Sequence, residues 1–497
     1  MNDTLESRVA PTDLPDLCQQ LLQNGGRMQM AYARYPQPGT PPEVVYIADQ
    51  AAREPFTAFR CQLDSNETCL PSLATISPLL GWYEREIHDL CGVRFEGSPE
   101  PYRLVLHEGA MPPLPPLDPQ FHPVQPIPFT PSAWRLPELQ GKDVHRLPFG
   151  PVRADVLESA QIVFYYIGEA ILHCHPQLFF KHRGMEKRFE GVHVEQAVLL
   201  AERISGVSSV CHALSFCQAV EGACQCTPPP RAQYLRVLLA ELERLYNHLH
   251  YLGHLCHTTT LKVGEAEGKL LEERAKQVNA ALTGSRFLRG LLTPGGLRRD
   301  LDTSRLYALL ENLKPEVGEY MANLEKTNSH LDRLITTGPL PRQVAFDQGA
   351  SGPIKRASGI DRDLRRDHPY AAYEELSIKI PVKTEGDAHA RAQVRMEEID
   401  SSIELIKEVL TRLPNGPIRV EIGPVRGREG LGWAEGPRGS VYYATHFNSS
   451  GRLARVKIKT PSFSNWRVFP FTVHDTNMMD YAINEASFGL TMAGSDR

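Results

Sequence analysis

The sequence has no run of 18 or more apolar residues, no Cys-x-x-Cys pair and no excess of positive charge. Its most apolar stretch, Gln161 to Phe180, is interrupted by Gly168, Glu169 and two histidines, so we expect no transmembrane helix. The N-terminus carries early acidic residues and no apolar signal region, so we do not expect export. Any association with a membrane is therefore expected to be peripheral.

Charge and cysteine content narrow the function classes further. The formal net charge of −5 argues against a general nucleic-acid-binding protein, which would normally have a basic surface. Ten cysteines in a chain without an export signal are better interpreted as reduced thiols than as a disulfide framework. Cys224 and Cys226 form a single Cys-x-Cys, and we predict no zinc or iron–sulfur site made by this chain alone.

A length of 497 residues allows two or three domains, and composition divides the chain into three parts. We predict an α+β fold in which residues 1–110 form an α/β domain, with a strand near Val44–Ala48. Residues 111–140 form a linker, because proline dominates from Met111 to Pro137 and favours extended backbone. Residues 141–497 form a mainly helical domain with a small β-sheet, which we expect to open near Leu147–Val152.

Two stretches of the third part have clear helical periodicity. Apolar residues recur at helical spacing from Val194, and the helix is broken near its middle by the turn Ser205–Ser208. Arg231 to His257 is the clearest helix, with a heptad-like seam formed by Leu235, Leu238, Leu242, Leu245, Leu249 and Leu252. A β-hairpin is predicted between Val441–Tyr443 and Leu453–Ile458, before a last helix that follows Lys459–Phe463.

Two histidine groups have spacings that invite a metal-binding interpretation. His250, His254 and His257 follow an i, i+4, i+7 pattern, but no cysteine or acidic residue lies in register, so we favour a hydrogen-bonded polar stripe. His173 and His175 flank Cys174, and the following Pro176 indicates that they end a helix.

The break in the first helix carries the most specific pattern in the chain. The run from Arg203 to His212 resembles the first metal-binding motif of nickel–iron hydrogenase large subunits, Arg-x-Cys-Gly-x-Cys with a histidine four residues later. Arg203, Gly206 and His212 match, whereas Ser205 and Ser208 occupy the two cysteine positions. A serine hydroxyl cannot replace a soft thiolate toward nickel or low-spin iron.

The C-terminus resembles the same family with the same kind of change. The family ends with Asp-Pro-Cys-x-x-Cys-x-x-(Arg or His), and alignment of the final acidic–basic residues puts Thr491 and Gly494 at its cysteines. The resemblance thus implies that all four metal-ligand positions, Ser205, Ser208, Thr491 and Gly494, are degenerate. We predict no metal in this chain.

Further motifs extend the resemblance over residues 81–100 and 147–497. The run from Glu84 to Pro99 looks like the signature of a peripheral-arm subunit of respiratory complex I, which corresponds to the N-terminal domain of formate-hydrogenlyase-type large subunits. His182 to Lys187 resembles the second hydrogenase motif, Arg-Gly-x-Glu. On these grounds the chain is identified as a member of the energy-converting, formate hydrogenlyase type of hydrogenase large subunit family.

The resemblance implies a set of candidate site residues. Glu186 corresponds to a glutamate that passes protons to the metal centre, and together with Arg203 and His212 it is a candidate for a proton path or pocket. The positions that would line the same pocket are His182, Arg183, Arg438, Lys459 and Asp496. Buried charges of this kind are costly unless they are paired, so we expect a polar network.

Several functions remain open. A working nickel–iron hydrogenase is excluded by the loss of four ligands. A quinone- or NAD(P)H-linked subunit like that of complex I is less well supported. That resemblance implies a tyrosine and a histidine at the quinone headgroup, but Gly206 stands near the tyrosine position and Arg153 near the histidine position, and neither can play the same part. The favoured interpretation is a subunit of a membrane-associated complex that couples electron transfer to ion translocation. A non-catalytic docking subunit is the other alternative, so enzyme status stays open.

The favoured interpretation implies partners and a location. The partners would be an iron–sulfur protein resembling hydrogenase small subunits, antiporter-like proteins and other membrane subunits, with no nucleic acid. Iron–sulfur clusters would belong to the partner, and this chain would bind no cofactor. It would lie in the cytoplasm on the inner face of the cell membrane. We also expect the long apolar seams and the run Glu84–Glu86 to form surfaces for partners.

Overall fold

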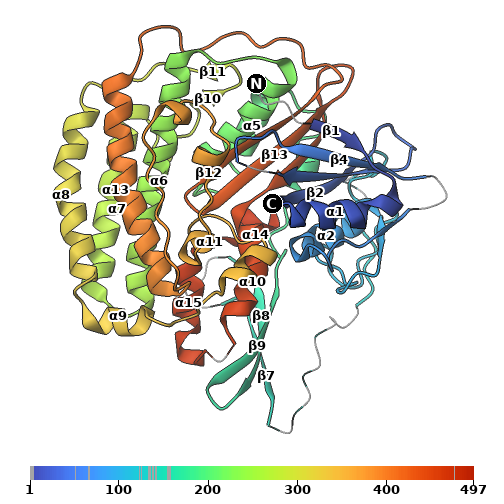
Figure 1. Ribbon diagram of the computed structural model, residues 1–497, viewed down its shortest axis with the longest axis horizontal. Coiled ribbons are helices and arrows are strands. Elements are labelled where there is room, and N and C mark those ends of the chain that lie inside the picture. Colours follow the sequence, from blue (N-terminus) through green and yellow to red (C-terminus); the bar gives the residue numbers. More distant parts are fainter. Residues whose placement is uncertain are drawn as a thin grey trace.

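The computed structural model describes residues 5–497 except 51, 65–67, 123, 125, 132–135, 137, 138, 140, 142, 154–157 and 475. A layer of long helices lies on one side of the molecule and the N-terminal region on the other, with a small three-stranded sheet projecting from the body (Figure 1). The mixture of helices and small sheets confirms the predicted α+β fold.

The N-terminal region is built on a four-stranded sheet. Its order is β1-β4-β3-β2, with β1 and β4 parallel and the other pairs antiparallel. The strands are Leu5–Arg8 (β1), Arg27–Arg34 (β2), Glu43–Asp49 (β3) and Thr57–Gln62 (β4), and helix α1 spans Leu14–Gln23. All seven residues of β3 are buried, since it lies between β4 and β2. The strand predicted near Val44–Ala48 is confirmed.

Helix α2 (Gly81–Cys91) corrects the expectation for Glu84–Glu86. Glu84 and Glu86 are 1% and 4% exposed, so this run is not a partner surface. Glu84 accepts hydrogen bonds from the Ser72 hydroxyl (2.6 Å) and the Leu73 amide (2.7 Å). A short parallel pair, Cys69–Pro71 (β5) and Arg94–Glu96 (β6), flanks the helix. Charge alone is a poor guide to exposure where local partners are available.

The proline-rich segment folds back on itself in its described part. The Met111 amide donates to Pro128 O (2.8 Å), and Ala110 forms an antiparallel bridge with Phe129. The segment also contacts the body, because Lys187 Nζ donates to Asp118 O (3.0 Å). Pro123 and Pro137 of the predicted linker lie outside the described residues.

The projecting sheet begins where the third part was expected to open. Its strands, His145–Phe149 (β7), Gln161–Ile167 (β8) and Ala170–Gln177 (β9), are antiparallel in the order β7-β8-β9. The interpretation of His173–His175 as the end of a helix is therefore wrong, because these residues lie in β9. Pro176 is tolerated near the end of this edge strand.

The predicted break in the helix near Val194 is confirmed. Helix α4 covers Val194–Ala201 and α5 covers Ser209–Cys224, with the short α3 (Met185–Arg188) before them. Helix α6, Pro230–Thr258, confirms the predicted long helix. Its leucine seam is buried within the chain, so the seam is not a surface for partners.

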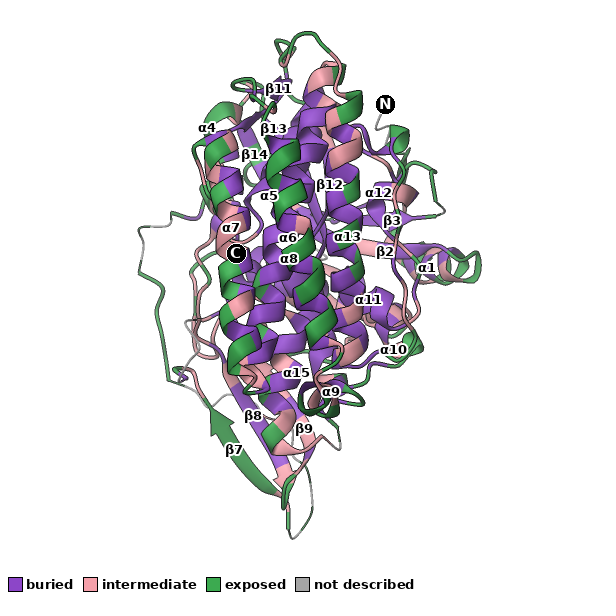
Figure 2. Ribbon diagram, turned by 90° about the vertical axis from the view of Figure 1, so that its left-hand side faces the viewer, coloured by how far each residue is buried: buried purple, intermediate pink, exposed green. Residues whose placement is uncertain are grey.

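Helix α6 packs against two long helices, α7 (Lys262–Thr283) and α13 (Ala388–Arg412). Helix α8 (Leu306–Leu324) packs on α7 and α13 from the outside and exposes one face (Figure 2). The shorter elements between α7 and α13 are β10 (Leu292–Thr293), β11 (Gly296–Leu297), α9 (Asn328–Leu334), α10 (Arg342–Asp347), α11 (Pro353–Ala357) and α12 (Leu364–Asp367). His250 and His257 bond to Glu272 and Glu265 of α7, both at 3.0 Å, as expected for a polar stripe.

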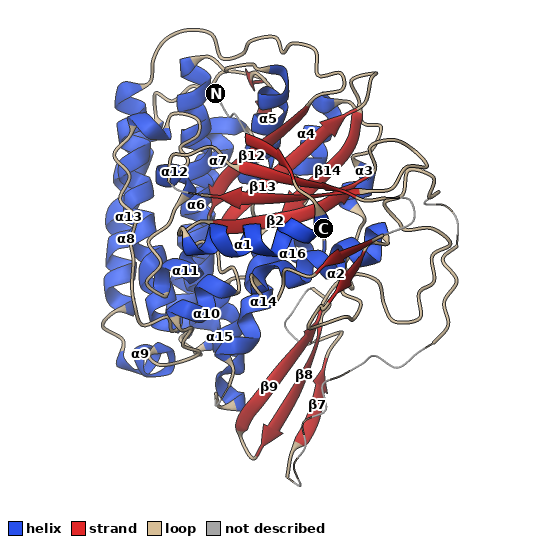
Figure 3. Ribbon diagram, turned by 45° about the vertical axis from the view of Figure 1, so that its right-hand side comes forward, coloured by secondary structure: helices blue, strands red, loops and turns tan. Residues whose placement is uncertain are grey.

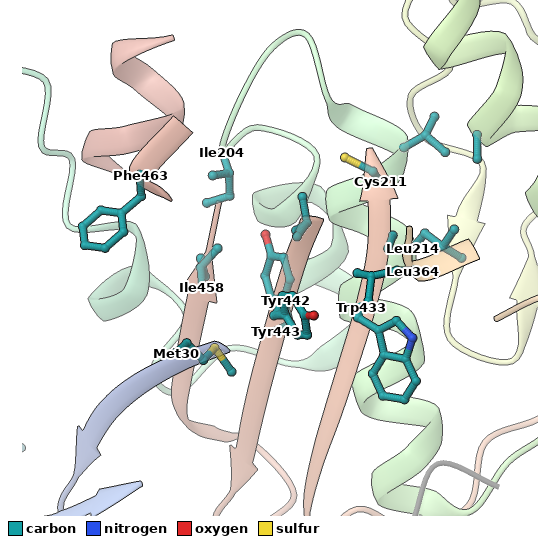
Figure 4. Packing of buried hydrophobic residues seen from close by; sticks show 14 of the residues in the cluster. Met30, Ile204, Cys211, Leu214, Leu364, Trp433, Tyr442, Tyr443, Ile458 and Phe463 are labelled. Atoms are coloured by element: carbon teal, nitrogen blue, oxygen red, sulfur yellow. The ribbon is translucent and has the colours of Figure 1, made fainter. Parts of the chain in front are cut away.

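An antiparallel sheet joins the helical layer to the N-terminal region (Figure 3). It contains β12 (Glu429–Gly436), β13 (Gly439–Phe447) and β14 (Leu453–Lys459), so the predicted hairpin is confirmed and β12 was missed. Helix α5 crosses β12 so closely that a Cβ at Gly430 or Gly432 would lie 2.0 or 2.1 Å from a carbonyl oxygen of α5. The core continues from α5 across this sheet to Met30 of β2 beside Ile458 (Figure 4).

The chain ends in three helices rather than the one predicted. They are α14 (Pro461–Val468), α15 (Tyr481–Phe488) and α16 (Met492–Asp496). Within the described part of the chain, no helix combines the length and the apolar character needed to cross a bilayer.

Candidate functional site

The site is formed by two segments far apart in sequence, the loop between α4 and α5 and the C-terminal residues 489–494. One guanidinium connects them. Arg183 Nη1 donates to Arg203 O (3.0 Å), and Nη2 donates to Ile204 O (2.6 Å) and Ala493 O (3.0 Å). The four predicted ligand positions therefore belong to segments that share a contact.

A second bridge runs through Asn247 of α6. Its amide Nδ2 donates to Val207 O (2.7 Å), and its Oδ1 accepts from Arg438 Nη1 (2.7 Å). Arg438 Nε in turn donates to Gly489 O (2.6 Å). Burial lowers the pKa of Arg438 to about 10, which leaves it charged at neutral pH. Arg183 and Arg438, both predicted pocket residues, thus hold the two segments together through backbone oxygens.

Ser205 and Ser208 are 4% and 3% exposed and form one tight turn, in which the Ser208 amide donates to Ser205 O (3.2 Å). Ser208 O accepts hydrogen bonds from the His212 amide (3.2 Å) and the Cys211 thiol (3.4 Å). The turn therefore starts α5 through its backbone.

Thr491 and Gly494 form the N-terminal cap of α16. The Thr491 hydroxyl accepts from the Gly494 amide (3.1 Å) and lies 3.3 Å from Ser462 Oγ. The carboxylate of Glu158 accepts from the amides of Met492 (2.5 Å) and Ala493 (3.1 Å). Negative charge and a threonine side chain at a helix start are stabilising. These positions therefore have a structural explanation of their own.

These residues do not fit a nickel–iron centre. The four positions offer three hydroxyls and a hydrogen atom, whereas such metals select soft thiolates. Across the described ranges, no group of three or more His, Cys, Asp or Glu side chains is arranged to hold a metal ion. A Cβ at Gly494 would also lie 2.6 Å from Thr491 Oγ1. We therefore derive no chemistry through a metal held by this chain.

Glu186 lies in a buried cluster of basic residues. Its carboxylate contacts Arg455 Nη2 (2.8 Å), Lys457 Nζ (3.2 Å) and Arg497 Nη1 (3.2 Å), and it accepts from the Ile458 amide (3.1 Å). Although burial raises its pKa, these charges dominate and hold the pKa well below the usual range. The lowered pKa argues against Glu186 as the proton carrier of the predicted path, because three cations stabilise its ionised form.

Glu86 belongs to the same cluster and was missed as a site residue. Its carboxylate bonds to Lys457 Nζ and to Arg497 Nη2, the latter at 2.6 Å. Two carboxylates and three cations therefore form one buried network that joins α2, α3, β14 and the C-terminal residue. The sequence signal was present in the Glu-Arg-Glu motif, whose two acidic residues both turn inward.

Asp496 is the candidate whose pKa lies near neutrality. Its side chain is fully buried, and burial raises its pKa to about 7 against the opposing effect of bonds from backbone amides, including Lys181 N (2.9 Å). One carboxylate oxygen, Oδ1, has no hydrogen-bond partner among the described residues. His182 Nδ1 donates to Asp496 O (2.6 Å), and burial lowers the pKa of that imidazole. A neutral histidine thus lies beside a carboxyl group able to exchange a proton.

The other predicted residues are distributed unevenly. His212 is buried, and its Nδ1 lies 2.9 Å from the Tyr443 hydroxyl; burial lowers its pKa to about 3, so it is neutral. Arg203 differs from the prediction of a pocket residue, because its side chain is 54% exposed, donates to Leu199 O (2.8 Å) and lies 3.7 Å from the carboxylate of the adjacent Glu202. Lys459 lies in a separate cavity, where Nζ donates to Gln29 Oε1 (3.1 Å).

Helix α6 supplies a further carboxyl group that was missed. Glu243 accepts from the amides of Val210 (2.7 Å) and Cys211 (3.0 Å) at the start of α5. Burial raises its pKa to about 7. The sequence feature that could have identified Glu243 is its position as an acidic residue within a helix rich in leucine.

A second buried network lies between α6, α11–α13 and β12. Glu398 contacts His248 Nε2 (2.7 Å) and Arg244 Nη1 (3.5 Å) and pairs with Arg356. Its other members are Glu241, Asp363, Arg365 and Glu435. The pKa of Glu398 is held well below its usual range by Arg356 and Arg244, so the network is ionised.

Comparison with known proteins places this arrangement in a family. The model of the respiratory-chain NADH dehydrogenase 49 kDa subunit matches residues 270–426 and 424–497, and that of the 30 kDa subunit matches 7–125. The nickel-dependent hydrogenase model matches residues 183–280, which include the loop before α5.

Individual relatives cover most of the chain. Formate hydrogenlyase subunit 5 of Escherichia coli K12 is 31% identical over 447 residues, which cover 88% of this chain and 79% of the relative. Hydrogenase-4 component G of the same organism is 28% identical, with 97% and 86% covered. The C/D subunit of NADH-quinone oxidoreductase from Rhodopseudomonas palustris BisB18 is 28% identical, with 94% and 89% covered. The chain therefore belongs to the hydrogenase large subunit family of the formate hydrogenlyase type, which is homologous to the fused 30 kDa-type and 49 kDa-type subunits of NADH-quinone oxidoreductase.

Proposed function

We propose that this chain is a subunit of a membrane-associated oxidoreductase complex related to complex I, and that it works without a nickel–iron centre of its own. In that complex it couples electron transfer from an iron–sulfur partner to ion translocation. The names of its relatives refer to formate hydrogenlyase, hydrogenase-4 and NADH-quinone oxidoreductase, all of them assemblies with numbered or lettered subunits.

One observation carries the proposal. The two segments that would hold the metal are joined by Arg183, yet their ligand positions carry hydroxyls and glycine while titratable groups remain buried around them. Asp496 and Glu243, with pKa values raised to about 7, are the groups able to exchange protons near neutral pH. Glu186 holds its charge and positions Arg455, Lys457 and Arg497.

The proposed partners follow from this role. They are an iron–sulfur protein resembling the small subunits of hydrogenases, antiporter-like proteins and other membrane subunits. The clusters belong to the iron–sulfur partner, and this chain binds no cofactor. It lies on the cytoplasmic side of the membrane and is held there by its partners.

The test uses the complex purified through a tag on this chain and reconstituted into lipid vesicles. A reduced viologen dye supplies electrons, a water-soluble quinone or NADP⁺ is offered as the acceptor, and an internal pH-sensitive dye or a sodium probe reports ion movement. We expect an ion gradient that requires this chain, no hydrogen evolution, and no nickel above background. Hydrogen evolution with about one nickel per chain would refute the proposal.

A non-catalytic docking role is the second candidate, and the firmly ionised Glu186 cluster favours it, because a locked ion network acts as a scaffold. The two functions differ in the effect of Asp496→Asn. A complex that assembles normally and pumps normally with this substitution would favour docking over coupling.

A further inference from the structure

A second polar cavity lies between strand β2 and the C-terminal body, away from the loop before α5. Its wall includes Arg27 and Gln29 of β2, Lys355 of α11, and Lys459 and Tyr442 from the central sheet. Its free volume of about 30 Å³ is room for roughly two water molecules. The cavity therefore lies where the N-terminal region packs against the rest of the chain.

Four cations in this wall, Arg27, Lys355, Lys459 and the half-buried Arg467, have no carboxylate partner among the described residues, and the first three are the most deeply buried. Arg27, Lys355 and Lys459 are 6%, 7% and 5% exposed. Arg27 Nη2 donates to Phe346 O (3.1 Å) while its Nε has no partner there, and Lys459 Nζ donates to Gln29 Oε1 (3.1 Å). A buried charge without a counter-charge is costly, so three in one cavity call for an anion.

The carboxylates of the cavity are already engaged elsewhere. Asp49 pairs with Arg362 (2.8 Å) and His368 (3.1 Å). Asp363 pairs with Arg356 (3.1 Å) and Arg365 (2.8 Å), and Asp367 pairs with Arg366 (2.7 Å). Each of the three lining acids thus has its own cation, and none of them lies within ion-pair distance of Arg27, Lys355 or Lys459.

The electrostatics agree with mutual repulsion inside the cavity. The pKa of Lys459 is lowered well below its usual range, first by burial and then by Arg27 and Lys355. The pKa of Lys355 is also lowered, mainly by burial; Glu435 opposes the shift, while Arg356 and Arg27 add to it. An anion between these groups would stabilise their charged forms.

We propose that this cavity binds a small inorganic oxyanion between Arg27, Lys355 and Lys459. The anion supplies the missing negative charge and links β2 to α11 and β14, so it stabilises the packing of the N-terminal region on the body. This site is independent of the proposed coupling function, since it contains neither Asp496 nor the loop before α5.

The test uses the full chain together with the subunits that co-purify with it. Equilibrium dialysis with radiolabelled phosphate, at constant ionic strength set with sodium chloride, measures binding, and thermal unfolding measures stabilisation. We expect saturable binding of about one phosphate per chain and a rise in Tm that saturates with it. Nitrate, a smaller oxyanion, should compete.

Lys355→Met is the decisive variant and exposed Lys269→Met is its control. Removal of one of three mutually repelling cations should weaken phosphate binding about tenfold or more, while Tm without phosphate stays equal or rises. The control should bind as the parent chain does. If Lys355→Met does not fold, Lys459→Gln replaces it. Phosphate binding that does not saturate, or that is unchanged in the folded variant, would overturn the proposal.

Discussion

The hydroxyl of Thr491 lies in the space that a side chain at Gly494 would need, since a Cβ at position 494 would approach Thr491 Oγ1 to 2.6 Å. That hydroxyl is held in place by the Gly494 amide (3.1 Å). The two residues that stand at the C-terminal ligand positions therefore fit each other, and a side chain at position 494 requires the Thr491 hydroxyl to move.

Gly494→Ala should accordingly lower the free energy of unfolding by about 1–3 kcal/mol, the usual cost of overpacking a close-packed site. Thr491→Ala alone should cost about 1 kcal/mol through loss of the helix cap. Because Thr491→Ala also removes the clash, the double variant should be more stable than the sum of the two single effects predicts. Urea unfolding measures all three, and strict additivity would contradict the close contact.

Arg183→Lys should loosen both segments of the site. A lysine ammonium is a point charge on a flexible stem, so it cannot reproduce the fork with which Arg183 reaches three carbonyl oxygens. We expect faster amide hydrogen exchange in residues 203–212 and 489–497 together. Exposed Arg203→Lys is the matched control and should leave exchange in the C-terminal segment unchanged. Faster exchange in one segment only would show that Arg183 does not couple them.

Much of the fold could be predicted because it depends on local pattern. The leucine spacing of α6 follows the helical period, and the β-prone runs of β13 and β14 mark strands that are buried on both faces. Strand β12 was missed because Gly430 and Gly432, which allow α5 to approach, are residues that normally weaken a strand.

The candidate site was harder to predict because its charges are paired over long sequence distances. In the sequence Glu86 belongs to a charged run typical of an exposed surface, but Lys457 and Arg497 meet it from more than 370 residues away, with separations of 371 and 411. Arg203 is the opposite case. It occupies a motif position that predicts a pocket residue, but its side chain is largely exposed, which the motif alone does not reveal. Motifs identified the segments, whereas ionisation states required the packed structure.

Glu186→Gln tests the assigned role of the ion cluster. Loss of the carboxylate charge leaves Arg455, Lys457 and Arg497 with Glu86 as their nearby acid, so we expect destabilisation of about 3–5 kcal/mol, typical of a broken buried pair. Glu186→Gln combined with Lys457→Met should recover part of the loss.

The pH dependence of that variant gives an independent check. The pKa of Glu186 is lowered in the folded chain, so its stabilisation is present above the ordinary glutamate pKa of about 4.3 and is lost as pH falls below it. Urea midpoints of the parent and Glu186→Gln should therefore approach each other progressively as the pH falls below about 4. A difference that is the same at pH 7 and pH 3 would mean that charge is not the cause.

Asp496→Asn should change both stability and coupling, in a direction fixed by the raised pKa of about 7. The fold favours the protonated carboxyl of Asp496. The stabilisation that this carboxyl gives to the folded chain is therefore complete below the ordinary aspartate pKa of about 3.9 and is lost as pH rises toward 7. Asparagine resembles the protonated form and does not titrate. The free energy of unfolding of the variant, relative to that of the parent chain, should thus rise by up to about 1.4 kcal/mol per pH unit across that window. The difference should level off above pH 7.

In vesicles the same variant removes the proton that the carboxyl group could exchange. If Asp496 serves coupling, ion translocation should fall about tenfold or more while electron transfer and assembly persist, the usual effect of losing a proton-transfer group. Asp361→Asn, at an acid whose side chain is 59% exposed, is the control and should pump normally. A normal gradient with Asp496→Asn, combined with the predicted stability profile, would leave Asp496 as a buried structural acid and would favour the docking role for this chain.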